Sequence, residues 1–249
     1  MTVIIDVKGL VKRFGPKVVL RQLDFKVEQG EFVALLGPNG AGKTTFLRIL
    51  SSLSRPTTGQ VMVAGYRLPH HAAAIRRRLG VVSHLPLLYG DLSAEENLRF
   101  YGRMYAVDGV ENRIHEVLDQ VGLILRRKDL VRTFSRGMQQ RLAIGRAILH
   151  DPEVLLLDEP HTGLDQDACD MLDQALRQVA VRGRTVVMTS HDLTRAEDLA
   201  SRFDVLTRGT IQSSISAADI PRDGLLAFYR KTLEQSQSNS SRQQREAAL

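Results

Sequence analysis

The chain has 249 residues, with 34 lysines and arginines against 28 aspartates and glutamates, one cysteine and no tryptophan. Hydrophobic residues make up 43% of it and charged residues 25%, which is ordinary for a globular protein and excludes collagen-like, disulfide-stapled and wholly disordered chains. Because Cys169 is alone, no internal disulfide can form and the fold must rest on its hydrophobic core. The net charge of +6 suits nucleic acid, an anionic membrane surface or nucleotide phosphates equally well.

The longest apolar runs, such as residues 154–157, are as short as strands and far below the roughly 18–20 residues that cross a bilayer. Residues 1–6 contain no basic region followed by an apolar stretch, so no secretory signal is expected. We therefore expect a cytoplasmic chain that has no membrane span of its own.

The first third of the chain predicts several strands and a glycine-rich turn that leads into a helix. Residues 23–27 alternate apolar and polar side chains, as a half-buried strand does, whereas residues 32–36 form the continuous apolar run that is typical of a strand buried on both faces. In chain order the predicted elements are strands over residues 3–7, 23–27 and 32–36, a helix from about 43 to 53, a strand over 59–65 and a basic helix around 75–78.

The next part adds a helical region and two further buried strands. Ser93 and Glu96 have the Ser-x-x-Glu spacing of a capping box and mark the start of a helical region that reaches about residue 120. Strands are predicted over residues 153–157 and 185–189, with a helix near 167–181 between them. This alternation predicts an α/β fold in which about residues 84–148 form a helical subdomain.

The carboxyl end differs in composition from everything before it. Residues 235–249 are almost all Ser, Gln, Asn, Arg and Glu, so few of them could join a hydrophobic core. We expect a folded domain over residues 1–234 and a disordered tail over 235–249.

A P-loop pattern, Gly-x-x-x-x-Gly-Lys-Thr, follows the strand predicted at 32–36 and opens the next helix. Small residues let the backbone wrap around phosphate oxygens, and the amides at the helix start complete an anion-binding cradle. We expect Lys43 to neutralise the β- and γ-phosphates, Thr44 to coordinate Mg²⁺ and Thr45 to reach the α-phosphate. The candidate nucleotide-binding residues here are Gly37, Pro38, Asn39, Gly40, Ala41, Gly42, Lys43, Thr44 and Thr45.

Two acids, Asp158 and Glu159, end the strand predicted at 153–157. In open α/β sheets, ligands bind at the edge formed by the carboxyl ends of the strands, and these two acids would lie at that edge. Asp158 is expected to hold the Mg²⁺ shell and Glu159 to polarise the attacking water. His191 follows the strand at 185–189, at the same predicted edge, and is expected to contact the γ-phosphate. Lys43, Glu159 and His191 are therefore the candidate catalytic residues.

A further segment, Ser135-Arg136-Gly137, opens a helix 23 residues before Asp158. The order of P-loop, Ser-x-Gly segment, acid pair and histidine resembles the nucleotide-binding subunits of ABC transporters, and the resemblance covers about residues 3–213. It implies a P-loop NTPase core of the ABC ATPase type, with an amino-terminal antiparallel β subdomain and a helical subdomain.

The resemblance also implies a head-to-tail dimer, formed by two copies of the chain or by the chain and a paralogue, with two ATP molecules between the subunits. Ser135 and Gly137 of one subunit would then contact the γ-phosphate bound by the other, helped by the amino end of their helix. Phe14 stands where the family stacks adenine on an aromatic ring, and residues 162–165 match the D-loop that crosses the dimer interface. The implied cofactors are ATP and Mg²⁺.

The sequence departs from the family pattern at two places. Arg136 replaces a glycine of the common signature and adds a cation near the phosphates held in trans. The glutamine of the Q-loop is missing, and the alignment places either His84 or Leu85 at its position. A histidine there could still contact a Mg²⁺-bound water, which makes His84 a candidate metal-site residue, whereas a leucine could not.

Within the family, residues 94–105 and 134–141 are similar to the haem-exporter ATPases of bacterial cytochrome c biogenesis. The expected function is ATP hydrolysis that powers an exporter through transmembrane permease subunits, on the cytoplasmic side of the cell membrane, with haem as the exported molecule. ATPases of drug, antibiotic or polysaccharide exporters share much of the pattern and are the alternative.

Two other classes of protein are disfavoured. ABC-type ATPases that act on nucleic acid or ribosomes carry two cassettes or long insertions, whereas this chain has one cassette in which Lys43 and Ser135 are 92 positions apart. No nucleic-acid partner is therefore expected. A kinase or small GTPase that shared only the P-loop would leave the Ser-x-Gly segment and His191 unexplained.

Overall fold

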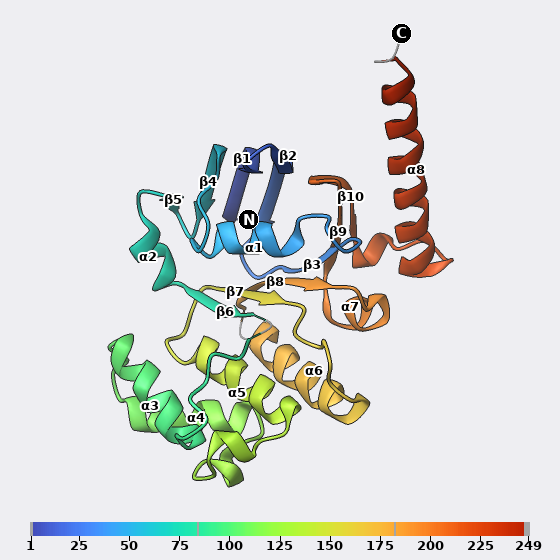
Figure 1. Ribbon diagram of the computed structural model, residues 1–249. Coiled ribbons are helices and arrows are strands. Elements are labelled where there is room, and N and C mark those ends of the chain that lie inside the picture. Colours follow the sequence, from blue (N-terminus) through green and yellow to red (C-terminus); the bar gives the residue numbers. More distant parts are fainter. Residues whose placement is uncertain (1, 84, 182, 247–249) are drawn as a thin grey trace.

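The structure, a computed structural model that describes residues 2–83, 85–181 and 183–246, contains two β-sheets (Figure 1). The smaller sheet is antiparallel and has the strand order β2-β1-β4-β5. Its strands are β1 (Val3–Phe14), β2 (Lys17–Glu28), β4 (Thr58–Val63) and β5 (Tyr66–Leu68). Leu23, Phe25 and Val27 are buried alternately along β2, so one face of the sheet packs on the core. This sheet is the amino-terminal antiparallel subdomain that the resemblance implies.

The larger sheet has six strands in the order β10-β9-β3-β8-β7-β6. All its neighbours pair in parallel except β10, which is antiparallel to β9. Its strands are β3 (Phe32–Leu36), β6 (Leu79–Val82), β7 (Val154–Asp158), β8 (Thr185–Ser190), β9 (Arg202–Thr207) and β10 (Thr210–Ser216). Every residue of β3, β7 and β8 is buried, because both faces of the sheet are covered.

Alternate residues of β3 enter different hydrophobic cores. Val33 and Leu35 pack with the antiparallel sheet and with Phe46 of α1 (Lys43–Leu50). Ala34 and Leu36 pack on the other face, together with residues of two helices that come after β7 in the chain. These are α6 (Gln166–Val181) and α7 (Leu193–Leu199). The sheet thus separates two hydrophobic cores. The carboxyl ends of its strands form an edge that neither core covers with a sheet or helix layer of its own.

The helical subdomain contains α3 (Ala94–Met104), α4 (Val110–Gln120) and α5 (Arg136–Ile148), with short 3₁₀ turns at Ile124–Arg126 and Val131–Thr133. The capping box is confirmed, since Ser93 Oγ accepts from the Glu96 amide and Glu96 Oε2 accepts from the Ser93 amide. The expected helical region splits at Gly109, whose left-handed φ of 59° turns the chain between α3 and α4. Helix α2 (Ala72–Arg76) is separate and lies beside β5.

The last helix, α8 (Gly224–Glu246), runs without a break through residue 235, where the composition predicted the start of a disordered tail. Two features account for this difference. Ser236 is only 8% exposed, with its Oγ 2.8 Å from Thr207 Oγ1, so the helix is still docked at that point. The segment after Gly224 also has no further glycine and no proline to end a helix. A short 3₁₀ turn, Ala217–Asp219, precedes α8, and the carboxyl end of α8 extends away from the other elements (Figure 1).

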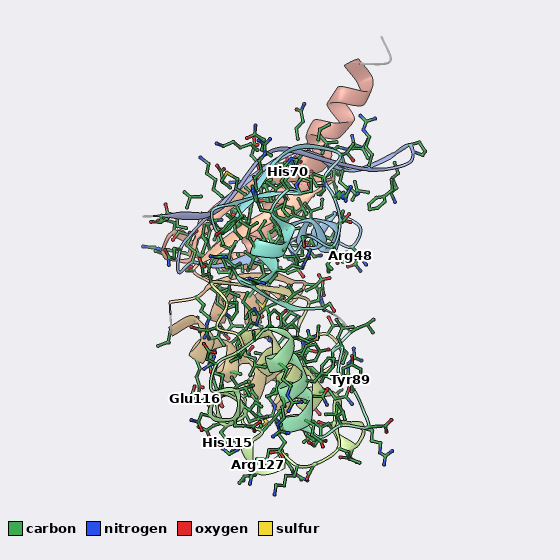
Figure 2. All side chains as sticks on the ribbon, turned by 90° about the vertical axis from the view of Figure 1, so that its left-hand side faces the viewer. Arg48, His70, Tyr89, His115, Glu116 and Arg127 are labelled. Carbon is green, nitrogen blue, oxygen red and sulfur yellow. The ribbon has the colours of Figure 1, made fainter. Side chains whose placement is uncertain are left out.

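The molecule is elongated, with His115 and Arg127 of the helical subdomain towards the end opposite His70, which follows β5 (Figure 2). Among the helices of the described segments, none combines the length and the apolar composition that a bilayer crossing requires.

Candidate nucleotide-binding and catalytic site

The P-loop joins the buried end of β3 to the start of α1, at the carboxyl edge of the larger sheet. Two of its glycines are required by the backbone. Gly37 has a φ of 152° and a Cβ there would overlap the carbonyl oxygen of Leu206, while Gly42 caps α1 with a φ of 112° and faces Leu20. These left-handed glycines let the loop curve tightly, as a loop that binds phosphate through its amide N–H groups must.

Lys43 is held inside this loop and is 6% exposed. Its Nζ donates to the carbonyl oxygen of Gly37 at 2.6 Å and to that of Pro38 at 3.4 Å. Its ammonium is also 3.6 Å from Glu159 Oε1. A buried cation at the start of a helix fits a phosphate group, because the ammonium and the helix amino end both supply positive charge to one small volume.

Thr44 and Asp158 come together although 114 positions separate them. Thr44 Oγ1 donates to Asp158 Oδ1 at 3.1 Å, and Thr189 Oγ1 of β8 donates to the same oxygen at 2.9 Å. A hydroxyl and a carboxylate oxygen are hard donors of the kind that hold Mg²⁺ beside substrate phosphates, so these residues fit the expected ion. Within the described residues no group of three or more His, Cys, Asp or Glu side chains could hold a metal alone.

Glu159 has the unusual φ of 52° for a residue with a side chain, and its amide donates to Thr189 Oγ1 at 2.9 Å. Its Oε2 accepts from Thr162 Oγ1 at 3.2 Å and is hydrogen-bonded to Nδ1 of His191. Burial raises the pKa of Glu159, but the hydrogen bond and charge of His191 together with Lys43 and Thr162 outweigh it, so the pKa lies below its ordinary value. The carboxylate is therefore ionised at neutral pH, as a group that polarises water must be.

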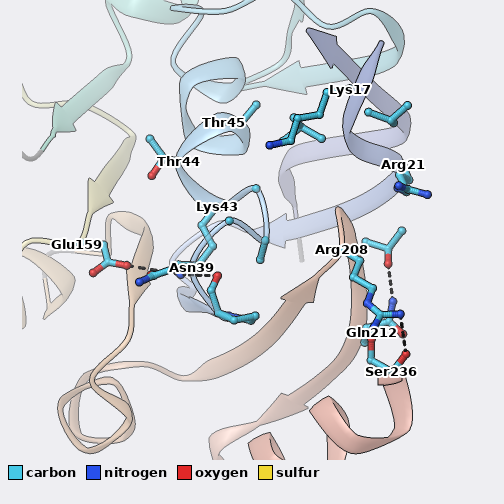
Figure 3. A pocket seen from close by; sticks show the side chains of 17 residues that line it. Lys17, Arg21, Asn39, Lys43, Thr44, Thr45, Glu159, Arg208, Gln212 and Ser236 are labelled. Atoms are coloured by element: carbon cyan, nitrogen blue, oxygen red, sulfur yellow. Dashed lines mark hydrogen bonds and ion pairs between the residues drawn. The ribbon is translucent and has the colours of Figure 1, made fainter. Parts of the chain in front are cut away.

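A cavity of about 990 Å³ runs along the P-loop from Glu159, and its size suits a nucleotide (Figure 3). All the P-loop residues from Pro38 to Thr45 line it. The sequence did not identify several others that line it as well, because they are brought there from β2, the β9–β10 turn, β10 and α8. These residues are Lys17, Val18, Val19, Arg21, Arg208, Thr210, Gln212 and Ser236.

Other sequence-predicted residues lie elsewhere in this single chain. Ser135 is exposed and caps α5, where its Oγ accepts from the Met138 amide at 3.3 Å, and neither Ser135 nor Gly137 lines the cavity. Phe14 is 54% exposed at the end of β1 and does not line the cavity, although Lys17, its partner in the hairpin, does. The roles expected for these three residues therefore stay predictions.

The two departures from the family pattern have different outcomes. His84 lies outside the residues that the structure describes, so its expected metal role stays a prediction, and Leu85 is exposed in the loop after β6. Arg136 packs its guanidinium against Gly163, so closely that a Cβ at Gly163 would overlap Arg136 Nη1. Within one chain this cation therefore covers the D-loop of its own subunit.

Taken together, the α/β sheet, the P-loop, the acid pair and the histidine define a P-loop ATPase of the ATP-binding-cassette class. A family model described as ABC transporter matches residues 20–162. The chain belongs to the ABC transporter family and is an ATP-hydrolysing subunit of such a transporter.

Named relatives and solved structures agree with this assignment. Linearmycin resistance ATP-binding protein LnrL of Bacillus subtilis is 37% identical over 207 residues, covering 82% of this chain and 67% of that protein. Nod factor export ATP-binding protein I of Cupriavidus metallidurans is 38% identical over 211 residues, covering 84% and 70%. A structure described as the ATP binding subunit of an ABC transporter has a TM-score of 0.83 at 30% identity, over 92% of this chain and 99% of that chain. A dimeric ATP-binding cassette in a post-hydrolysis state, bound to ADP and Pi, has a TM-score of 0.76 at 28% identity, over 86% and 98%.

Proposed function

We propose that this chain powers an exporter of the drug, antibiotic or polysaccharide class. The relatives named above are described by linearmycin resistance and by Nod factor export, and these descriptions support this alternative better than haem export. The similarity to haem-exporter ATPases rests on residues 94–105 and 134–141 alone. The chain would act as a peripheral subunit at the cytoplasmic face of the membrane, bound to transmembrane permease subunits.

The observation that carries the catalytic part is that Lys43 and Glu159 lie together at one end of a nucleotide-sized cavity, and that His191, outside the cavity lining, is hydrogen-bonded to Glu159. Phosphate oxygens of ATP bind the P-loop amides and Lys43. Glu159 accepts the proton of the attacking water, and His191 orients the Glu159 carboxylate and donates to the γ-phosphate. Thr44 and Asp158 would hold Mg²⁺, which would supply the charge neutralisation that phosphoryl transfer needs.

The relationship to a dimeric ATP-binding cassette supports a second element of the proposal. Ser135 and Gly137 lie at the start of α5 and do not reach the cavity of their own chain. We infer that a second copy or a paralogue supplies them in trans, so that each complete site uses residues of two subunits.

The test compares cells that lack this chain with cells that carry the wild-type chain or Lys43→Ala. Loss of function should lower tolerance to an exported antibiotic or reduce surface polysaccharide, and only the wild type should restore it. Covalent haem attachment to c-type cytochromes, measured by haem staining, should stay unchanged. Loss of haem attachment with unchanged tolerance and polysaccharide would overturn the proposal in favour of haem export.

A further inference from the structure

The end of the nucleotide cavity away from Glu159 is lined by polar side chains that belong neither to the P-loop nor to the acid pair. Figure 3 shows Glu159 and Lys43 at one side of the cavity and Arg208, Gln212 and Ser236 at the other. Lys17, Arg21 and Arg208 bring three positive charges to it. Since the phosphates of ATP bind at the P-loop, this end of the cavity faces the rest of the nucleotide.

Arg208 stands on the turn between β9 and β10, and this turn is fixed from two sides. The Gly209 amide donates to the carbonyl oxygen of Ala41 in the P-loop at 3.1 Å, and the Arg21 amide donates to the carbonyl oxygen of Gly209 at 2.9 Å. A side chain at Gly209 would overlap the carbonyl oxygen of Val19, so the turn is pressed against β2. Arg208 itself has a left-handed φ of 49°. The position of the turn is therefore fixed relative to the P-loop and to β2.

Helix α8 fixes the same turn from a third side. Thr207 and Ser236 are 3% and 8% exposed, and their hydroxyl oxygens lie 2.8 Å apart. Arg208 Nη1 donates to the main-chain carbonyl oxygen of Ser236 at 3.4 Å. Leu225 and Thr232 are buried on the same helix, so the docked face of α8 continues to Ser236. Ser236 therefore docks α8 and forms a wall of the cavity at once.

We propose that Arg208 binds the nucleoside part of ATP, at its ribose hydroxyls and adenine ring, and that Ser236 of α8 is the residue that positions Arg208. The inference rests on the proposed function, because it takes the triphosphate to occupy the P-loop. A guanidinium has five N–H donors in a plane, so one bond to α8 leaves donors for hydroxyls and a flat face for a base. Helix α8 is then part of the nucleotide site.

The experiment uses the full chain and two probes, ATP–Mg²⁺ and inorganic tripolyphosphate–Mg²⁺, with affinities measured by calorimetry. Arg208→Ala should weaken ATP binding about 10-fold, as loss of a hydrogen bond to a charged group does, and change tripolyphosphate binding by less than about 2-fold. In ATP hydrolysis the KM should rise while kcat stays near the wild-type value.

Ser236 is tested by a matched set of variants. Ser236→Ala should shift the KM for ATP in the same direction by a smaller factor, and Ser236→Thr, which keeps the hydroxyl, should restore it. Ser238→Ala is the control, because the exposed Ser238 hydroxyl donates within its own helix, to the Glu234 carbonyl oxygen. It should leave both affinities unchanged.

Three outcomes would overturn the inference. Unchanged ATP affinity in Arg208→Ala would show that the turn only supports the fold. Equal losses for ATP and tripolyphosphate would show that Arg208 acts on phosphates. A Ser236→Ala effect that Ser236→Thr fails to restore would remove Ser236 from the positioning role. Failure of the wild-type chain to bind either probe would instead overturn the proposed function.

Discussion

Glu159 is the residue at which the charges of the site meet. Its carboxylate is shared by His191, Thr162 and the ammonium of Lys43, and its backbone is held in a left-handed conformation by the Thr189 hydroxyl. Such a conformation costs on the order of 1–3 kcal/mol and persists where surrounding contacts over-determine it. The strained backbone of Glu159 therefore points to a carboxylate that must be oriented in one direction, even at a cost to the stability of the fold.

Lys43→Ala should abolish useful ATP binding and hydrolysis. The change removes the buried cation of the phosphate cradle, where fixed charges commonly contribute several kcal/mol. Binding would be followed with a fluorescent ATP analogue and hydrolysis by phosphate release. Lys8→Ala is the matched control, since Lys8 is an exposed lysine of β1 that does not line the cavity. Hydrolysis near the wild-type rate in Lys43→Ala would contradict the P-loop assignment.

At the scale of elements, the P-loop leaves no room for even one added methyl group at Gly37. Gly37→Ala should reduce ATP affinity by at least about 10-fold, because the new methyl group must displace the Leu206 carbonyl and with it the end of β9. Gly65→Ala is the control: Gly65 has a φ of 77°, but no atom lies within 4 Å of the place that its new methyl group would take. Calorimetry with ATP would compare the two variants. Gly65→Ala introduces backbone strain alone, whereas Gly37→Ala introduces backbone strain and an overlap with a neighbouring atom. A Gly37→Ala chain that binds as tightly as Gly65→Ala would show that the loop relaxes.

A half-buried histidine just after α5 joins the end of that helix to the strand β6. His150 Nε2 donates to the Leu79 carbonyl oxygen at 3.0 Å, and its ring stacks on Tyr105 with centroids 3.9 Å apart. Nδ1 is buried with no hydrogen-bond partner among the described residues. Burial therefore lowers the pKa of His150 from 6.5 to about 4, since a second proton would have no acceptor.

This histidine predicts a loss of stability in mild acid. The pKa in the folded state is below that in the unfolded state, so the stabilisation is complete above pH 6.5 and is lost as the pH falls towards about 4. Between pH 7.5 and pH 5, the contribution of His150 to the free energy of unfolding should fall by up to about 2 kcal/mol. Urea unfolding at both values would measure it. His150→Gln keeps a donor without titrating, and its pH-dependent loss should be smaller by that amount; an equal loss in both proteins would contradict the assignment.

Local sequence signals predicted the elements that carry their own pattern. The apolar run at β3 coincides with Phe32–Leu36, and the Ser93–Glu96 spacing produced the capping box, because both depend on neighbouring residues only. In contrast, β9 and β10 were not predicted. The burial of β9 depends on its pairing with β3, which is distant in sequence, and β10 has no fully buried residue and includes three serines. Pairing also extended β1 to Phe14, well past the run that predicted it.

The same distinction applies to the site. The P-loop and acid pair are local motifs, and their meeting through Thr44 and Asp158 followed from the parallel-sheet expectation. The wall formed by Arg208 and Ser236 could not be predicted, because it requires a turn and a helix to converge on a loop roughly 170–195 positions earlier in the chain. Arg136 is similar, since only the folded chain shows it against Gly163.

At the scale of the whole molecule, one chain holds only part of the expected site. Lys43, Thr44, Asp158, Glu159 and His191 converge, whereas Ser135 begins a helix outside the cavity. A nucleotide in the P-loop would present its γ-phosphate beside Glu159, where a second subunit could reach it. ATP would therefore join two chains, and hydrolysis would release them.

Glu159→Gln tests this coupling, because it keeps the side-chain size and removes the charge that activates water. ATP should still bind, hydrolysis should fall by on the order of 10²-fold or more, and the retained nucleotide should hold two subunits together. Size-exclusion chromatography with light scattering, with and without ATP–Mg²⁺, would detect the dimer. A second change, Ser135→Arg, should dissolve it by adding bulk and charge at the contact in trans, whereas Leu125→Arg, at a residue that is 91% exposed, should not.

The hydrolysis rate and the oligomeric state test different parts of this mechanism. Normal hydrolysis by Glu159→Gln would remove Glu159 from its role as base and with it the assignment of the acid pair. A variant that binds ATP tightly but stays monomeric at tens of micromolar would leave the chemistry intact and exclude a self-sufficient homodimer. The permease would then have to bring the two ATPase subunits together, because the surface around Ser135 alone would not hold them. A dimer that survives Ser135→Arg would place the interface elsewhere on the chain.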